Sequence, residues 1–443
     1  MSRVTGRLLR LAAAAAAFCA LAAPASALDL FVAATPADVA AASARPAALP
    51  AGAARQRLAA VDPATLSALT QGRAANRTIT IGLFPGVARK FAVTSAEPSF
   101  SGGVIVRAQA GDDDATLVVK AGKATGRVRV AGRTYSVQPA GGRLHAISET
   151  SRALLPPHGP APEAAASAQP RPMVGPVAPQ AGQDVATVDV LFVYTAKAKA
   201  AAQDIGAEID YAVAITNEAY EASGVNMRMR LVKTLKSGAY DEDARDYTDT
   251  LYDLTGGGEQ AAYFDKTRKA RDKTGADFVV LLREGGGYCG IGWVNADAST
   301  AADFAFAEVS RGICVDVDTV AHEVGHTMGL RHDRYVTKDE NGGELPSWQY
   351  NFGYVSLKAR AMDLMSYENK CWDAGVACEF KRLFSSPKLK VNGKKFGVAE
   401  GKPGAADGVR WLNEIRWIAA GLRPAKVAAT TGVAASAQAS EDE

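Results

Sequence analysis

The stretch Ala321 to Arg334, which reads AHEVGHTMGLRHDR, constrains the fold of this chain more than any other feature. His322 and His326 are four residues apart, so in a helix both imidazoles leave the same face and can bind one metal ion. Glu323 lies beside that face, where a carboxylate reaches a metal-bound water rather than the metal itself. The sequence therefore predicts a helix that carries two metal ligands and a general base.

Gly329 and His332 extend this pattern. Glycine tolerates positive φ, so Gly329 is predicted to end the helix and turn the chain, which brings His332 in from another direction. Three neutral imidazoles with an open fourth position are typical of a catalytic zinc site, whereas a structural site is closed by four protein ligands. We therefore expect one catalytic zinc ion on His322, His326 and His332. The alternative is a helix whose histidines are merely hydrogen-bonded.

The full pattern H-E-x-x-H-x-x-G-x-x-H-D resembles the metzincin clan of zinc endopeptidases, and Asp333 places the resemblance in the reprolysin-like branch. The resemblance implies an α+β or α/β catalytic domain with a twisted mixed sheet, a zinc helix and a methionine turn. It also implies that Asp333 is a buried structural carboxylate beside His332. In the hydrolytic mechanism that the resemblance implies, Glu323 takes a proton from the attacking water and passes it to the leaving amine.

Leu364-Met365-Ser366-Tyr367 is similar to the methionine turn of this clan. Met365 would then form a hydrophobic floor beneath the imidazoles, with Met362 as the alternative for that role. Tyr367 matches a position where some metzincins carry a tyrosine close to the metal, from which a phenol can donate to a developing oxyanion. Ordinary packing is the other interpretation of Tyr367.

The run Gly290-Ile291-Gly292-Trp293-Val294 resembles the metzincin edge strand, which pairs with an extended substrate through backbone hydrogen bonds. The sequence HEVGHTMGLRHD further resembles the peptidyl-Asp metalloendopeptidases. This resemblance implies that the substrate has an acidic side chain directly after the peptide bond that is cut. The basic residues considered for binding that side chain are Arg360, Lys370, Lys381 and Arg382.

The function expected from these features is hydrolysis of peptide bonds in proteins or peptides. A zinc-retaining binding module or inhibitor without turnover is the alternative, and a zinc amidase acting on cell-wall substrates is a third. Glu323 discriminates between the first two, because only catalysis needs it. The spacing of His332 disfavours the third.

The first 27 residues have the pattern of a secretory signal peptide. Arg3, Arg7 and Arg10 precede an alanine-rich apolar run, and Ala25-Ser26-Ala27 supplies a small-x-small cleavage site. We expect a protein that is exported, to the periplasm or beyond the cell, and that does not span a membrane. Without this segment the chain carries no net charge, which disfavours a nucleic-acid partner.

Four cysteines follow the signal peptide, an even number in an oxidising compartment. Four cysteines allow three pairings, and Cys289–Cys314 with Cys371–Cys378 is favoured because both bridges close short loops. A second zinc site is less favoured, since no C-x-x-C knuckle is present.

The remaining chain divides by composition. Residues 77–149 alternate as strands do and loosely resemble the propeptide of reprolysin-like proteases, whereas a weak helical pattern covers Gln56 to Leu69. His145 is interpreted as a structural residue of a strand, and His158, in a Pro/Ala-rich linker, as a solvated side chain. The predicted segments are a signal peptide (1–27), a mainly β propeptide (28–152), the linker (153–183), the catalytic domain (184–424) and a disordered acidic tail (425–443).

Within the catalytic domain, strand patterns at Ala186 to Val193 and Val225 to Val232 flank a helical pattern at Lys197 to Ser223. This order predicts a βαβ unit with a parallel sheet and a right-handed crossover. The acidic run Asp241 to Asp253 raises the possibility of a calcium site, but it lacks a D-x-D-x-D-G loop and a solvated loop is favoured.

Charge is distributed unevenly between the two parts of the chain. Residues 28–180 carry a net charge of +7 and residues 181–443 a net charge of −7. Opposite signs favour docking of one part on the other, as for a propeptide that inhibits its own enzyme within a monomer, although the two charges can also lie on surfaces that never meet. No cysteine lies between residues 28 and 288, so a thiolate cannot cap the zinc, and the inhibitory group is left open.

Overall fold

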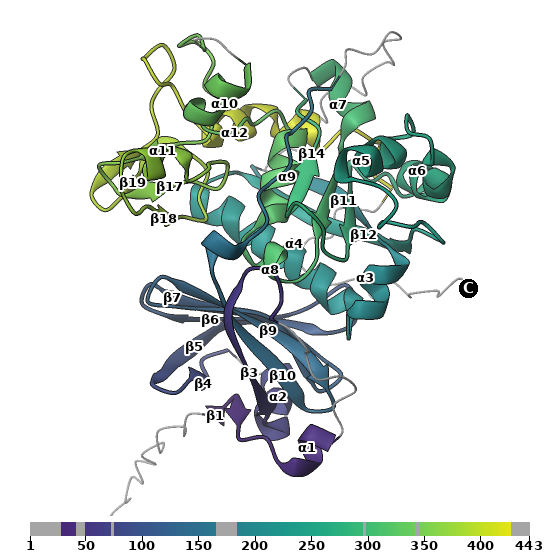
Figure 1. The fold of residues 1–443 in the computed structure, drawn as a ribbon, viewed down its shortest axis with the longest axis vertical. Coiled ribbons are helices and arrows are strands. Elements are labelled where there is room, and N and C mark those ends of the chain that lie inside the picture. The colour runs from purple at the N-terminus through teal and green to yellow at the C-terminus, as the bar shows by residue number, and fades with distance from the viewer. Residues whose placement is uncertain are drawn as a thin grey trace, which may run out of the picture.

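The computed structural model describes residues 28–40, 49–71, 75–164, 184–295, 298–341 and 345–426. The predicted signal peptide, most of the predicted linker and nearly all of the predicted acidic tail lie outside these ranges. Figure 1 shows two parts, a β-rich N-terminal part below and a larger part of mixed helices and strands above. Within these ranges no helix is both long and apolar enough to cross a membrane.

The N-terminal part is one ten-stranded sheet in the order β1-β4-β5-β6-β7-β8-β9-β10-β3-β2. Neighbouring strands are antiparallel, except that β1 runs parallel to β4. The strands are Leu28–Asp29 (β1), Phe31–Val32 (β2), Ala53–Val61 (β3), Thr78–Phe84 (β4), Val87–Pro98 (β5), Val104–Ala110 (β6), Asp113–Lys120 (β7), Lys123–Val130 (β8), Arg133–Gly141 (β9) and Leu144–Thr150 (β10), with short helices at Pro36–Ala40 (α1) and Pro63–Thr70 (α2).

Two hairpins of this sheet follow directly from their turn residues. Ala121-Gly122 joins β7 to β8 and Ala131-Gly132 joins β8 to β9, and all four residues have positive φ. Positive φ at both positions of a two-residue turn matches the right-handed twist of the flanking strands. The glycine at the second position lowers the cost of that geometry.

The helix expected over Gln56 to Leu69 is only half present. Residues 53–61 are strand β3, which pairs with β10 and β2, and α2 begins only at Pro63. Asp62 accepts a hydrogen bond from Thr65 N and caps this helix, and Pro63 fits its first turn. Pairing with β10, a partner distant in sequence, therefore outweighs the local helical pattern of β3.

The larger part is built on a five-stranded sheet in the order β12-β11-β13-β15-β14. The first four strands are parallel and β14 runs antiparallel at the edge. They are Ala186–Tyr194 (β11), Met227–Lys236 (β12), Phe278–Arg283 (β13), Gly290–Gly292 (β14) and Phe306–Ser310 (β15). The predicted βαβ unit is β11, helix α4 (Ile205–Ser223) and β12.

Both faces of this sheet are covered, which explains its nearly continuous apolar strands. Val190 and Phe192 of β11 belong to the core that α4 and α9 (Thr319–Thr327) share, whereas Leu191 and Val193 belong to the core on the opposite face. The opposite face is covered by α5 (Tyr247–Thr255) and bordered by α6 (Asp265–Thr274). The other helices before α9 are Ala196–Ala201 (α3), Ala298–Phe304 (α7) and Ile313–Asp316 (α8).

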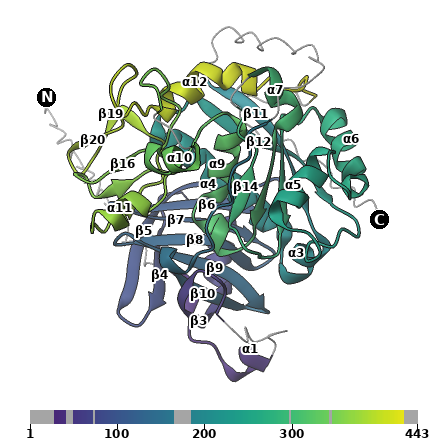
Figure 2. The same ribbon diagram turned by 45° about the horizontal axis from the view of Figure 1, so that its top comes forward.

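After α9 the chain forms a small C-terminal region, which lies on the opposite side of α9 from α5 and α6 (Figure 2). It has a three-stranded sheet, a two-stranded sheet and a terminal helix. Its elements are Arg334–Asn341 (α10), Val355–Ser356 (β16), Ala361–Met362 (β17), Asn369–Asp373 (α11), Glu379–Phe380 (β18), Ser386–Val391 (β19), Lys394–Phe396 (β20) and Gly408–Ala419 (α12).

The two parts meet where α4 packs on strands β6, β7 and β8. Ion pairs of the expected sign cross this boundary, from Arg107 to Glu218 at 2.9 Å and from Lys120 to Asp204 at 3.1 Å. The most deeply buried pair joins Arg127 Nη1 of β8 to Asp318 Oδ2 at 2.8 Å, and both side chains are fully shielded from solvent. The alternative in which the two charged surfaces never meet is therefore wrong for these residues.

Candidate metal centre and its cleft

Three histidine nitrogens converge at one point of the larger part. His322 and His326 extend from one face of α9, and His332 returns from the segment after the helix. The Nε2 atoms lie 3.1 Å apart for His322 and His326, 3.0 Å for His326 and His332, and 3.3 Å for His322 and His332. All three side chains are buried.

The hydrogen bonds of the other ring nitrogens, the Nδ1 atoms, show that the Nε2 atoms of His322 and His326 are available to bind a metal ion. Nδ1 of His322 lies 2.8 Å from the Leu364 carbonyl oxygen, and Nδ1 of His326 lies 2.7 Å from the Leu330 carbonyl oxygen. A carbonyl only accepts, so each Nδ1 carries the proton and each Nε2 presents a lone pair. Burial also lowers the pKa of both rings well below the ordinary value.

Converging lone pairs repel unless a cation lies between them, and zinc bound at 2.0–2.1 Å to a tetrahedral site needs nitrogens about 3.3 Å apart. The residues therefore fit a zinc ion.

Gly329 produces the turn that brings His332 to the other rings. Its φ is +86°, and its N–H donates to the His326 carbonyl at 2.8 Å just after α9 ends. An added Cβ would lie 2.7 Å from the Asn295 carbonyl oxygen and 3.0 Å from the Trp411 ring. Both the backbone conformation and the space require glycine at this position.

Replacing Gly329 by alanine should therefore cost zinc affinity as well as stability. The new Cβ must displace backbone at Asn295 while the residue holds a positive φ, a strain of about 1–3 kcal/mol or more. We expect lower zinc occupancy after dialysis, measured by elemental analysis, together with a lower thermal midpoint. Gly393→Ala is the matched control, because Gly393 also has a positive φ (+71°) but nothing within 4 Å of its added Cβ. Equal zinc retention in the two variants would contradict this role of Gly329.

Glu323 is buried between α9 and the edge strand. A Cβ atom added to Gly290 would lie 2.7 Å from Glu323 Oε1, and one added to Gly292 would lie 2.8 Å from the Glu323 carbonyl oxygen. Only glycine therefore lets β14 approach the helix this closely. Burial raises the pKa of the Glu323 carboxyl well above its ordinary value. Because burial disfavours the ionised carboxylate, a nearby cation would be needed to stabilise the charged form that acts as a base.

The remaining predicted site residues lie around the three rings. Met365 is buried beneath α9, with its sulfur 2.9 Å from the place of a Cβ on Gly325, whereas Met362 lies in β17 and packs in a separate cluster. Asp333 is buried and accepts hydrogen bonds from Tyr335 N and Tyr367 N, both at 3.1 Å. It thus ties the His332 segment to the methionine turn. The Tyr367 ring centroid lies 4.3 Å from that of His332.

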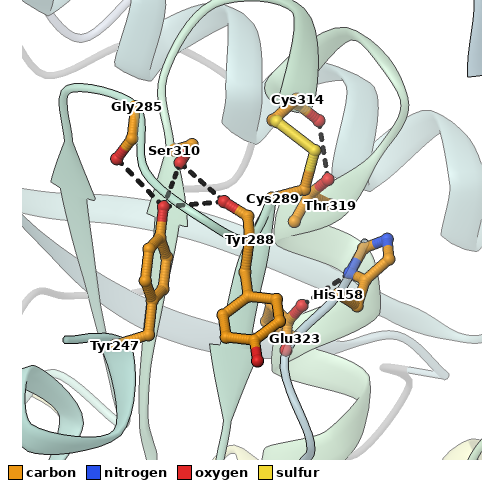
Figure 3. The surroundings of a disulfide bond; sticks show 9 residues. All are labelled: His158, Tyr247, Gly285, Tyr288, Cys289, Ser310, Cys314, Thr319 and Glu323. Atoms are coloured by element: carbon orange, nitrogen blue, oxygen red, sulfur yellow. Dashed lines mark hydrogen bonds and ion pairs between the residues drawn. A yellow bond between two sulfur atoms is a disulfide. The ribbon is translucent and has the colours of Figure 1, made fainter. Parts of the chain in front are cut away.

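Both favoured disulfides are present. Cys289–Cys314 joins the residue before β14 to α8, so it fixes the edge strand against the start of the α9 region (Figure 3). Cys371–Cys378 joins α11 to the chain just before β18. The first bridge therefore positions the wall of the cleft.

The outer edge of β14 is paired with the chain that follows the N-terminal sheet. The backbone hydrogen bonds run from Cys289 N to Pro157 O at 2.7 Å, from Gly159 N to Gly290 O at 2.7 Å, and from Val294 N to Pro162 O at 2.8 Å. We call residues 157–164 the cleft segment. β14 ends at Gly292, so Trp293 and Val294 of the predicted edge strand lie just beyond it, and the Trp293 indole N–H donates to Thr255 Oγ1 while its ring packs in the core. Figure 1 shows the chain rising from the sheet alongside α9 and β14.

His158 is the clearest correction to the sequence interpretation. It is not a solvated linker side chain: its Nδ1 lies 2.8 Å from Glu323 Oε1, and its ring stacks on His322 with centroids 3.9 Å apart. Figure 3 shows the imidazole directed at the Glu323 carboxyl. His145, by contrast, is buried in β10 and accepts from Ala124 N at 2.9 Å, as a structural residue does.

The sequence interpretation also missed Arg331. Its Nη1 lies 2.6 Å from Glu163 Oε1 of the cleft segment, and it immediately precedes His332. Its position next to a predicted metal ligand was the signal by which the sequence could have identified it. None of the four basic candidates has a contact directed at the cleft among the interactions that the structure describes. Arg382 pairs with Glu218, Lys381 with Glu379, and Arg360 and Lys370 reach the carbonyl oxygens of Ala377 and Val355.

The acidic run considered for calcium is occupied by other partners. Asp253 accepts from Arg245 at 3.1 Å and from Tyr240 at 2.9 Å, and Asp243 pairs with Lys197 at 2.6 Å. Asp246 caps α5. A helix, α5, does begin within this run, whereas Glu242 and Asp253 are buried rather than solvated.

Comparisons with known proteins agree with the geometry of the metal centre. Residues 184–377 match the reprolysin-like M12B metallopeptidase family. A Pseudomonas aeruginosa protein named peptidyl-Asp metalloendopeptidase is 31% identical over 264 residues, which cover 55% of this chain and 41% of the relative. A Stenotrophomonas maltophilia protein of the same name is 29% identical over 304 residues, or 65% of this chain and 67% of that one.

This chain thus spans about two fifths of the length of the Pseudomonas relative. Among solved structures, metalloproteinase-II from Bacteroides fragilis is similar with a TM-score of 0.38 at 12% identity, over 60% of this chain and 85% of that one. That likeness is too distant to add to the argument. The sequence match and the three converging imidazoles lead to one conclusion: residues 184–377 form a reprolysin-like metallopeptidase domain.

Proposed function

We propose that this chain is an exported zinc endopeptidase that is synthesised in a latent form. The observation that carries the proposal is the convergence of three buried imidazoles beside a buried carboxyl, at the edge of a sheet that already holds an extended peptide. A bound zinc ion would supply an activated water and polarise the carbonyl of the peptide bond that is cut. His322, His326 and His332 would hold it.

The residues around the ion would carry out the remaining steps. Glu323 would take the proton of the attacking water and deliver it to the leaving amine. The backbone of β14 would hold a substrate through the same N–H and C=O groups that now bind the cleft segment. Tyr367, whose ring lies beside that of His332, would donate its phenol O–H to the developing oxyanion.

Latency is the second part of this proposal. The cleft segment binds backbone groups of Cys289, Gly290 and Val294 at the sheet edge, where a substrate would also bind, so residues 28–164 would inhibit the enzyme until the chain is cut and they leave. The predicted linker beyond residue 164 would be where this cut is made, because a Pro/Ala-rich composition favours proteolytic nicking. The two disulfides support export into an oxidising compartment, with residues 1–27 removed as a signal peptide.

The experiment that tests the proposal compares three samples on a peptide library: the uncut chain, the chain cut at a protease site inserted in the predicted linker after residue 164 and freed of its N-terminal part, and the freed enzyme with a chelator. We expect cleavage only by the freed enzyme, restored by added zinc after chelation. Mass spectrometry of the products identifies the bonds cut. A freed enzyme that binds zinc but cuts no peptide would favour the alternative, a zinc-retaining binding module or inhibitor.

Substrate choice is proposed to include an acidic side chain. Relatives bear the name peptidyl-Asp metalloendopeptidase, and here Arg331 binds the Glu163 carboxylate within the cleft. Arg331 is largely buried and its backbone is fixed by hydrogen bonds with Asn351 and Gly353. A bidentate guanidinium held this way suits a carboxylate of a bound peptide.

In the freed enzyme, Arg331→Gln should lower kcat/KM about tenfold for peptides with an acidic residue facing this position, because one charge-assisted hydrogen bond is lost. Peptides with glutamine in place of the acid should be cut as well as before. Parallel profiling of both enzymes on acidic and neutral libraries measures the change. Arg360→Gln is the control, since its side chain lies away from the cleft. An unchanged acidic preference in Arg331→Gln would exclude this residue as its source.

A further inference from the structure

The cleft segment is attached to the larger part at three separate side chains. Before it, Arg152 Nε lies 3.3 Å from Glu368 Oε1, in the segment that follows the methionine turn. In its middle, His158 contacts Glu323 and His322. Near its end, Glu163 pairs with Arg331 at 2.6 Å. The two outer contacts are ion pairs at partly exposed positions. Of the three side chains, only His158 contacts a predicted metal ligand and the predicted general base.

The backbone geometry gives His158 a particular role. The segment runs parallel to the chain of β14, with Glu163 opposite Val294. Pro157 O and Gly159 N bind the β14 region on either side of His158. Because both neighbours are turned toward the strand, the residue between them projects its side chain toward α9. The group presented to Glu323 is therefore an imidazole, and not a peptide carbonyl that could be attacked.

The position of Gly159 fits the same arrangement. A Cβ there would lie 3.1 Å from Ile291 Cβ and 3.3 Å from the Gly290 carbonyl oxygen. The residue after His158 is thus pressed against β14, which fixes the imidazole above the Glu323 carboxyl. The adjacent Pro160 is exposed.

We propose that His158 is the latch of the latent form: its Nδ1 binds the Glu323 carboxyl and its ring covers His322, so the general base is blocked by a histidine of the same chain. This inference deepens the proposed function and rests on it. The inhibitory group that composition left open is thereby an imidazole directed at the base. It differs from inhibition by a thiolate or carboxylate on the metal, because the atom that matters is the one bound to Glu323.

The test uses the full uncut chain with zinc bound, in four forms: the native sequence, His158→Ala, His158→Asn and Pro160→Ala. The amide of asparagine places a hydrogen-bonding atom where Nδ1 lies but has nothing in place of Nε2. Peptide hydrolysis is measured while mass spectrometry verifies that the chain stays uncut. Hydrogen exchange of the Gly159 and Ala164 amides, which donate to Gly290 O and Val294 O, reports whether the segment stays seated.

We expect His158→Ala to raise hydrolysis by the uncut chain about tenfold to a hundredfold, as loss of a hydrogen bond to a charged group implies, and to speed exchange at both amides. His158→Asn should retain most of the latency, and Pro160→Ala should behave as the native chain. Zinc content should be equal in all four. An uncut His158→Ala chain as inactive and as slowly exchanging as the native one would overturn the latch.

Two further outcomes separate the possible errors. If His158→Asn is as active as His158→Ala, latency depends on Nε2 and the assignment to the base is wrong. If the freed enzyme, which no longer contains positions 158 and 160 and is the same protein from all four chains, cuts no peptide, the proposed function fails rather than the latch. An active freed enzyme, combined with latency of the uncut chain that is lost only in His158→Ala, supports both.

Discussion

Replacing Glu323 by glutamine in the freed enzyme is expected to lower kcat by about 10²–10⁴-fold, the usual contribution of a general base. Glutamine preserves the shape of the side chain between α9 and β14 but cannot accept the proton of the attacking water. The three histidines are untouched, so zinc content measured by elemental analysis should equal that of the native enzyme. Steady-state kinetics on one peptide substrate gives the change in kcat.

Glu242→Gln is the matched control for this substitution. Glu242 is also buried, and it accepts a hydrogen bond from Glu284 N at 2.9 Å, away from the metal centre. It should alter stability but leave kcat within about threefold. An active Glu323→Gln enzyme with full zinc content would refute the assigned base, whereas parallel losses of zinc and activity would point to a structural role.

The metal centre was predictable because its information is local. His322, His326, Gly329 and His332 lie within eleven residues, and helix periodicity with one glycine turn fixes their directions. The βαβ unit was predictable for a similar reason, since β11, α4 and β12 follow one another with clear periodicity. In each case a short stretch of sequence contains all the groups that interact.

The errors of the sequence interpretation arise where a partner is distant. His158 is 165 positions from Glu323, and its proline-rich surroundings cannot build a core of their own. The segment is ordered because it completes the edge of β14, a partner that composition does not reveal. The strand β3 was hidden in the same way, since its pairing with β10 lies about 90 positions away, with Gln56 bonded to Ser148.

Arg127 shows how far such distant contacts determine stability, and its replacement by methionine is expected to destabilise the latent form by about 3–5 kcal/mol. The guanidinium is fully buried, with Nη1 2.8 Å from both Asp318 Oδ2 and the Asp316 carbonyl oxygen. Burial already raises the pKa of Asp318 to about 6 with Arg127 beside it. Without the arginine this carboxyl is left buried and uncompensated. Chemical denaturation of the uncut chain measures the loss.

The pH dependence distinguishes this explanation from lost packing alone. In Arg127→Met the folded-state pKa of Asp318 should rise above the value of about 6 that it has beside the arginine, so above pH 6 the folded variant binds more protons than the folded native chain and the loss of stability should grow as pH increases from about 6. Arg133→Met is the control, because the Arg133 side chain is largely exposed and its partner Glu149 keeps an ion pair with Arg55, so stability should change by less than about 1 kcal/mol. Asp318 also begins the metal-binding helix with a φ of +63°, a conformation that non-glycine residues rarely adopt. If the Arg127→Met deficit were small or independent of pH, the arginine would not be what holds Asp318 in that conformation, and the N-terminal sheet would dock through its apolar contacts with α4 instead.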